Sequence, residues 1–320
     1  MRRKKSKNHF FRNAVLLLVV CACAGLFYAY RQEKAAHPEE SWQEAAQKTI
    51  TDTVEKGKDL TPEGKDSEDK EKKASEQKGV TKKQPASPAS SSDWLPGLSK
   101  RQYKGKLAVV IDDCGYDMEA LRTLTRLPLP MSFAIIPFKT HSRDALQEIH
   151  SQGRVAMLHL PMEPMSGGSS EPEAVKVGMT REQIQRFTQK AIDSLPGIQG
   201  VNNHQGSRAT SNGPTITAAL STMKQNGLFF VDSRTSSSTV AEEKAAALGM
   251  RTGHNSLFLD NSADEETIRR QIGRAIALAD QYGSIIVICH ARPHTAAAWK
   301  KSAAAIQATG IRLVPVTDVL

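Results

Sequence analysis

Several acidic and imidazole side chains in this sequence stand where apolar runs of strand type end. They are Asp112, Asp113, His159, His204 and His290. Carboxylate and imidazole ligands suit a divalent transition metal such as zinc. A set of one aspartate and two histidines leaves coordination positions open, as a catalytic metal requires. These residue types therefore predict a catalytic metal centre, in which a further carboxylate acts as general base and a further histidine as general acid.

Each of these residues also has a structural interpretation. Asp112 or Asp113 could cap the helix that follows. A single histidine at a strand end is usually structural, but three at the ends of different strands favour a functional site. Other polar residues at strand ends are candidates for substrate binding, namely Glu163, Asn203, Asp232, Arg234 and Arg292. The two arginines could equally well pair with Asp232.

The elements that must position these groups alternate between strand and helix from about Lys104 onwards. Apolar runs predict strands at Leu107–Ile111, Met131–Ile136, Val155–His159, Leu228–Val231, Ser284–Cys289 and Ile311–Val314, with weaker ones at Gly200–Asn203 and near Arg251 or Leu257. Amphipathic segments predict helices at Asp117–Arg126, Arg143–Ser151, Thr180–Ser194, Pro214–Asn226, Val240–Leu248 and Asp264–Gln281. Thr180 and Gln183 form a capping-box pattern. Such alternation predicts an α/β fold with a parallel sheet, either a barrel or a doubly wound sheet. In both, the site lies at the carboxyl ends of the strands.

At these strand ends the sequence resembles the divergent polysaccharide deacetylases, a branch of the sugar deacetylase superfamily. The matching segments are Val109-Val-Ile-Asp-Asp-Cys-Gly115, His159-Leu-Pro-Met-Glu-Pro164, Val201-Asn-Asn-His-Gln-Gly-Ser207, Phe230-Val-Asp-Ser-Arg-Thr-Ser236 and Cys289-His-Ala-Arg-Pro293. They occur in order over nearly the whole α/β region, and the first hundred residues lie outside the match.

The resemblance implies a distorted parallel (β/α) barrel of about seven strands and a metal-dependent hydrolase that deacetylates N-acetyl sugars of an envelope polysaccharide. By analogy, Asp113 is a metal ligand, Asp112 the base and His290 the general acid. His159 lacks the second nearby histidine of the usual pattern, so we assign the remaining ligand to His204 from its position. The Arg-x-Pro-Tyr type segment is also absent. These departures leave a second hypothesis open, a non-catalytic glycan-binding or scaffold protein of the cell envelope.

The N-terminus predicts export. A basic flank without acids precedes an apolar run from Ala14 to Tyr30, about 17 residues and so at the short limit for a spanning helix. Cleavage after Ala24, lipid attachment at Cys23 and an uncleaved signal anchor all fit this segment, and the anchor is slightly favoured. We expect a protein anchored in the inner membrane and facing the periplasm, or released to the periplasm if the leader is cleaved.

Composition divides the rest of the chain. We expect a basic flank and signal or anchor segment over 1–31, a polar disordered tether over 32–103 and the deacetylase-like domain over 104–320. The net charge of +9 does not predict nucleic-acid binding, because roughly six of these charges precede the apolar run as a topology signal. No glycine-rich nucleotide loop follows a strand. Cys114 and Cys289 could form a disulfide or remain buried thiols.

Overall fold

Eight parallel strands form the centre of the structure, a computed structural model that describes residues 94–168 and 171–320. The strands are β1 (Lys106–Cys114), β2 (Ser132–Ile135), β3 (Val155–Met162), β4 (Gly200–Gln205), β5 (Phe229–Asp232), β6 (Thr252–Phe258), β7 (Ser284–His290) and β8 (Arg312–Val314). Most begin or end within a few residues of the predicted runs. The weak run at Gly200 and the ambiguous one near Leu257 are both strands.

The first seven strands close into a ring. Their order is β2-β3-β4-β5-β6-β7-β1, and β1 pairs again with β2. One edge of β1 is shared by two partners: Lys106–Ala108 pairs with β8, and the stretch from Val110 to Cys114 pairs with β2. At the amino end of β1, β8 therefore takes the place that β2 has at the carboxyl end. This arrangement confirms the predicted distorted barrel of about seven strands.

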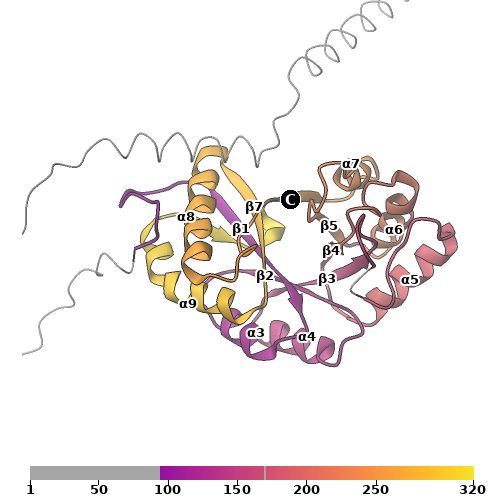
Figure 1. Ribbon diagram of the computed structural model, residues 1–320, viewed down its shortest axis with the longest axis horizontal. Helices are drawn as coiled ribbons and strands as arrows, with labels where there is room; N and C mark the ends of the chain where they lie inside the picture. Colours follow the sequence, from indigo (N-terminus) through magenta and orange to yellow (C-terminus); the bar gives the residue numbers. More distant parts are fainter. Residues whose placement is uncertain (1–93, 169–170) are drawn as a thin grey trace, which may run out of the picture. The chain divides into compact units, whose positions relative to one another are not determined.

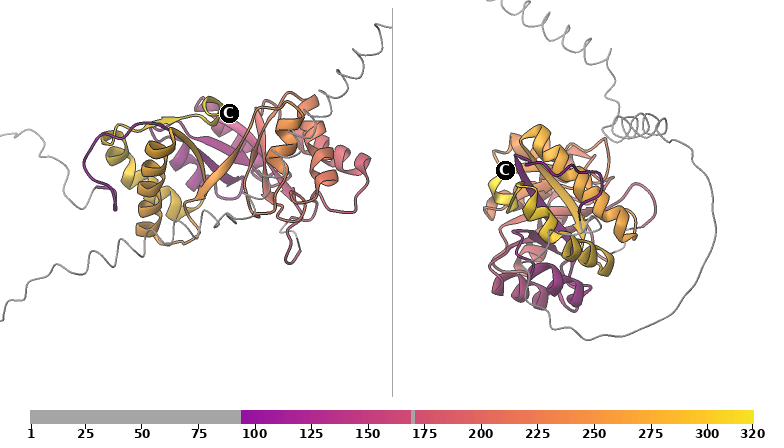
Figure 2. Two further views of the ribbon diagram at one scale, coloured as in Figure 1. Left: turned by 90° about the horizontal axis from the view of Figure 1, so that it is seen from above. Right: turned by 90° about the vertical axis from the view of Figure 1, so that its left-hand side faces the viewer.

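Helices cover the outside of the barrel (Figures 1 and 2). They are α3 (Met118–Thr125), α4 (Ser142–Ser151), α5 (Arg181–Asp193), α6 (Gly213–Gln225), α7 (Ala241–Ala247), α8 (Glu265–Tyr282) and α9 (Pro293–Ala308), followed by the short 3-10 helix η2 (Val316–Asp318). Thr180 and Gln183 form the predicted capping box at the start of α5. The sequence did not predict α9, because its many alanines give little contrast between an apolar and a polar face.

The period of two along each strand separates the inside of the barrel from the outside. Ala108, Val110, Met157, Val231 and Ile288 belong to a small apolar cluster inside the ring. Their strand neighbours, such as Leu107 and Val109, belong to the larger core beneath the helices. Apolar side chains thus fill the barrel near the amino ends of its strands. Polar residues occupy the next inward positions, toward the carboxyl ends.

The described segment before β1 contributes side chains to the core. Leu95 and Tyr103, which precede the expected domain start at residue 104, are buried in the core. The apolar run 14–30 and most of the tether lie outside the described residues. Within 94–168 and 171–320, no helix has the length and apolarity needed to cross a membrane.

Cys114 and Cys289 are free, and both are buried. The indole N–H of Trp299 donates to the Cys289 sulfur at 3.3 Å. Burial raises the pKa of both thiols well above their ordinary value, because the low-dielectric interior disfavours a thiolate. The structure therefore shows two buried thiols and not a disulfide.

Gly200 at the start of β4 allows the Phe229 ring to pack inside the barrel. A Cβ atom built on Gly200 would lie 2.1 Å from that ring, and Phe229 is itself buried at 4% exposure. We expect Gly200→Ala to lower the free energy of unfolding by about 1–3 kcal/mol, because the enclosed ring has little room to move. Urea or thermal unfolding measures this loss, and Gly168→Ala, whose Cβ would meet nothing within 4 Å and whose backbone angle is open to any residue, is the matched control. Equal stability of Gly200→Ala and wild type would contradict the packing described.

Candidate metal centre

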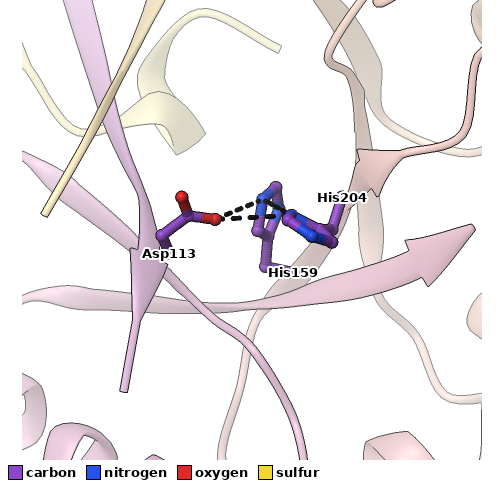
Figure 3. A group of neighbouring side chains, drawn as sticks. All are labelled: Asp113, His159 and His204. Atoms are coloured by element: carbon purple, nitrogen blue, oxygen red, sulfur yellow. Dashed lines mark hydrogen bonds and ion pairs between the residues drawn. The ribbon is translucent and has the colours of Figure 1, made fainter. Parts of the chain in front are cut away.

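Three side chains from three strands converge at the carboxyl end of the barrel. They are Asp113 from β1, His159 from β3 and His204 from β4 (Figure 3). Asp113 Oδ1 lies 3.5 Å from His159 Nε2 and 3.3 Å from His204 Nδ1. The two imidazole nitrogens are 3.1 Å apart. One oxygen and two nitrogens therefore form a nearly equilateral triangle.

The size of this triangle fits a metal ion. Ligands about 2.0–2.1 Å from zinc at tetrahedral corners are about 3.3–3.4 Å apart, and the observed sides bracket that separation. Asp113 Oδ1 is buried and has no hydrogen-bond partner of good geometry. A buried carboxylate oxygen without such a partner is costly, and a cation at the centre of the triangle would satisfy it. The side chains of Asp113 and His204 are partly exposed, so the open side of the site reaches solvent.

A break in the regular pleat of β1 brings both aspartates to this site. Asp112 continues the inward series of Ala108 and Val110, whereas Asp113 belongs to the outward series. At Asp113 the backbone enters the left-handed region, with φ of 59°, and the register with β2 shifts between Ile111 and Cys114. The resulting irregularity turns the Asp113 carboxylate back toward the barrel mouth. Two consecutive carboxylates thereby serve one site.

Asn202 connects the base candidate to a metal-ligand candidate. Its side-chain Nδ2 donates to Asp112 Oδ1 at 2.8 Å, and its Oδ1 lies 2.8 Å from His159 Nδ1. Since a carboxylate only accepts, the amide oxygen must face His159 and accept its Nδ1–H. A neutral His159 then carries a free electron pair on Nε2, the nitrogen in the triangle. Asn202, which is fully buried, thus fixes the tautomer that a metal needs.

The electrostatics of the site follow from burial and close charges. Burial acts to raise the pKa of Asp113, but the close approach of the His159 and His204 rings outweighs it and holds the pKa well below its ordinary value. Burial raises the pKa of Asp112, against the opposing charge of His159 and His290. Burial lowers the pKa of His159, yet the nearby charges of Asp112 and Asp113 leave it raised. The two aspartates are therefore driven apart in acidity, as expected for a ligand and a base.

His290 is held by a buried carboxylate that the sequence interpretation missed. His290 Nδ1 lies 2.8 Å from Asp260 Oδ1, and the backbone N–H of His290 donates to Asp260 Oδ2. The hydroxyl of Thr295 donates to the same oxygen at 2.6 Å. Burial lowers the pKa of His290, but the hydrogen bond and charge of Asp260 outweigh it and leave the pKa raised. Asp112 and His290 are register partners on the neighbouring strands β1 and β7. The pair of His290 and Asp260 therefore lies beside Asp112, the candidate base.

Two predicted substrate-binding residues face away from the barrel mouth. Asn203 and Asp232 alternate with the inward residues of their strands. Asn203 donates to the backbone oxygen of Gln205 and accepts the backbone N–H of Ser233. Asp232 accepts the backbone N–H of Arg234 and the hydroxyl of Thr239. Both are at 1% exposure, and their polar atoms serve the loops that follow the strands.

The other three predicted substrate-binding residues lie on loops after strands. Glu163 accepts the backbone N–H of Val177 and pairs with Arg208 at 3.3 Å. Arg234 pairs with Glu242 at 3.2 Å rather than with Asp232. Arg292 is half exposed and reaches Asp113 Oδ2 at 3.4 Å. Of the predicted group, Arg292 is the one in direct contact with the triangle, and substrate binding by all five stays a prediction.

Comparisons with known proteins agree with this picture. A sequence model of the family described as divergent polysaccharide deacetylase matches residues 109–320. The protein YibQ of Escherichia coli (strain K12), named as uncharacterized, is 35% identical over 201 residues, which cover 63% of this chain and 63% of that protein. A Haemophilus influenzae protein is 37% identical over 194 residues, or 61% of this chain and 69% of the relative. The match thus spans less than two thirds of the length of YibQ.

A solved structure has the same fold. Protein ATU2773 from Agrobacterium tumefaciens C58 superposes with a TM-score of 0.65 at 20% identity, covering 72% of this chain and 94% of the other. At this identity the likeness establishes the architecture alone. The chemistry must therefore be argued from the residues at the barrel mouth.

Proposed function

This chain belongs to the divergent polysaccharide deacetylase family, and from that premise we propose that it is a metal-dependent hydrolase acting on N-acetyl sugars of an envelope polysaccharide. The observation that carries the proposal is the triangle of Asp113, His159 and His204. Its sides match the ligand separations of a tetrahedral zinc site. Three protein ligands leave a fourth position for water or substrate, which distinguishes catalytic from structural sites.

The residues around the triangle have complementary roles in acetyl removal. A divalent ion held there supplies Lewis acidity, which makes water acidic and polarises a carbonyl. Asp112, next to the triangle and 3.5 Å from His159 Nε2, accepts the proton of the attacking water. His290, with Nδ1 bonded to Asp260, directs Nε2 as an acid that protonates the leaving amine. Arg292 adds positive charge beside Asp113, where negative charge develops on the acetyl oxygen.

The place of action is part of the proposal. The basic flank and apolar run at the N-terminus support export, with the domain on the outer side of the inner membrane. A polar tether would let the domain reach a glycan at a distance from that membrane. An envelope polysaccharide is the acetylated polymer available to such a protein.

Acetate release from an N-acetylated chito-oligosaccharide tests the proposal. We expect the purified full chain loaded with zinc to release acetate, a metal chelator to abolish the release and added zinc to restore it. Sugar binding without acetate release, unchanged by chelator, would favour the glycan-binding or scaffold hypothesis instead. If the protein neither binds the sugar nor releases acetate, both hypotheses are overturned.

Asp260 is expected to be a positioning residue for the reaction. Asp260→Asn should lower kcat about a hundredfold, because His290 loses the carboxylate that orients it and favours its protonated form. The raised pKa of His290 should fall toward its ordinary value. Because a general acid must be protonated, the alkaline limb of the activity profile should then move to lower pH. The kcat–pH profile measures this shift, and metal content should be unchanged. An unaltered alkaline limb would show that Asp260 has only a structural role.

A further inference from the structure

Large apolar side chains are exposed on the loops that follow β1, β2 and β3. Among the described residues, four large hydrophobic side chains are exposed: Tyr116, Phe138, Met165 and Tyr282. The first three follow β1, β2 and β3, whose carboxyl ends form one side of the barrel mouth. Tyr282 ends α8 immediately before β7, at the opposite end of the barrel. Exposed apolar surface is therefore concentrated on the rim that carries the triangle.

The Tyr116 ring is held in place by two charged partners. Its hydroxyl donates to Glu171, a carboxylate that is only 6% exposed. Lys139 pairs with the other Glu171 oxygen at 2.5 Å and lies 4.9 Å from the centre of the Tyr116 ring. The cation and carboxylate thus orient a ring that remains 48% exposed. An aromatic fixed in this way loses little conformational freedom when a ligand contacts it.

Phe138 is presented in an uncommon backbone conformation. Its φ is 65°, although it is 44% exposed and has a bulky side chain. The non-glycine residues with positive φ in the described part of the chain are Asp113, Phe138, Gln205 and Arg234, and each lies at or just after the carboxyl end of a strand. Backbone strain of this kind concentrates at functional sites. The Phe187 ring, 6.2 Å away, and Lys190, 4.9 Å away, fix the Phe138 ring.

The segments that carry the two aromatic residues are linked to the segment that carries Asp113. Tyr116 comes three residues after Asp113. The backbone N–H of Ile136 donates to the oxygen of Cys114 at 3.0 Å, which joins the segment before Phe138 to the segment before Tyr116. Both aromatic residues therefore lie on loops that leave the barrel on the Asp113 side of its mouth.

We propose that Tyr116 and Phe138 form a platform for the sugar units that flank the reacting N-acetyl sugar of the polysaccharide chain. This inference rests on the proposed function and adds two residues that contact the substrate beyond its reacting sugar. A pyranose ring has one face of C–H groups that packs on an aromatic ring, while its hydroxyls stay in water. The half-exposed, fixed rings suit such a ligand. Their cations, Lys139 and Lys190, are already paired with Glu171 and Glu173, so the platform favours a neutral chain over an anionic one.

Binding of N,N',N'',N'''-tetraacetylchitotetraose to the full chain tests the platform. The background is Asp112→Asn with zinc present, in which the tetramer should persist long enough for calorimetry. Tyr116→Ala and Phe138→Ala should each weaken tetramer binding about 3- to 10-fold. Neither should change zinc content or binding of monomeric N-acetylglucosamine. Tyr282→Ala, an equally exposed aromatic at the other end of the barrel, is the matched control and should bind as the background does.

The outcomes separate the platform from the proposed hydrolase. Weaker tetramer binding in both aromatic variants supports the platform even if the wild type releases no acetate, a result that would overturn the hydrolase alone. Acetate release by the wild type together with unaltered tetramer binding in both variants would overturn the platform alone. Equal losses for tetramer and monomer would also overturn it, because the rings would then contact the reacting sugar. No tetramer binding by the parent protein counts against the platform as well.

Discussion

Replacing His204 by alanine is expected to remove the bound metal while leaving the barrel folded. The variant retains two of the three atoms of the triangle and loses the nitrogen that lies 3.3 Å from Asp113 Oδ1. Loss of a group that merely orients a ligand costs about 10–100-fold in metal affinity, so loss of the ligand itself should cost more than about a hundredfold. Zinc content after dialysis, together with competition against a chromophoric chelator, measures the change.

His290→Ala is the matched control for this experiment. His290 is a partly buried histidine of the same rim, but its nitrogen is bonded to Asp260 and it lies outside the triangle. We expect this variant to keep its metal and to lose activity. If His204→Ala binds zinc stoichiometrically with wild-type affinity, or if His290→Ala is the variant that loses it, the ligand assignment is wrong.

Asp112→Asn is expected to abolish most of the activity without loss of metal. The amide has the size of the carboxylate and can still accept the hydrogen bond from Asn202, so the local structure should be kept. It cannot accept a proton from water, and general-base catalysis typically contributes about 10²–10⁴-fold. We therefore expect kcat for acetate release to fall about a thousandfold, measured on zinc-loaded protein with a coupled acetate assay.

Asp232→Asn is the control that distinguishes the loss of a general base from the loss of any buried negative charge. Asp232 is another nearly inaccessible aspartate at a strand end, but its oxygens accept from Arg234 and Thr239 on the outer side of β5. Its amide variant should retain metal and most of kcat, at some loss of thermal stability. Comparable activity losses in Asp112→Asn and Asp232→Asn would contradict the role given to Asp112.

Much of the architecture was predictable because strand and helix periods differ and because parallel strands end at one rim. The apolar runs ending at Asp112, His159 and His290 located the barrel mouth. Periodicity could not find α9, whose alanine-rich sequence has little amphipathic contrast. It also could not show that β8 shares an edge of β1 with β2, since that pairing depends on contacts distant in the chain.

The site was predictable in its residue types but not in the direction of each side chain. Strand parity, once the inward positions are known, places Asn202 inside and Asn203 outside. The sequence interpretation named Asn203 as a candidate and did not name Asn202. Asp113 breaks the parity rule through its positive φ, which no local pattern announces. Asp260 follows an irregular strand whose end was uncertain, so its bond with His290 was not foreseen.

The most direct test of the metal centre is an anomalous-difference map, recorded at the zinc edge, from crystals of the zinc-loaded full chain. Our account predicts one strong peak about 2.0–2.2 Å from Asp113 Oδ1, His159 Nε2 and His204 Nδ1. Asp112 and His290 should lie outside its ligand sphere. A strong peak bound elsewhere, or no peak at this triangle with zinc in excess, would contradict the account.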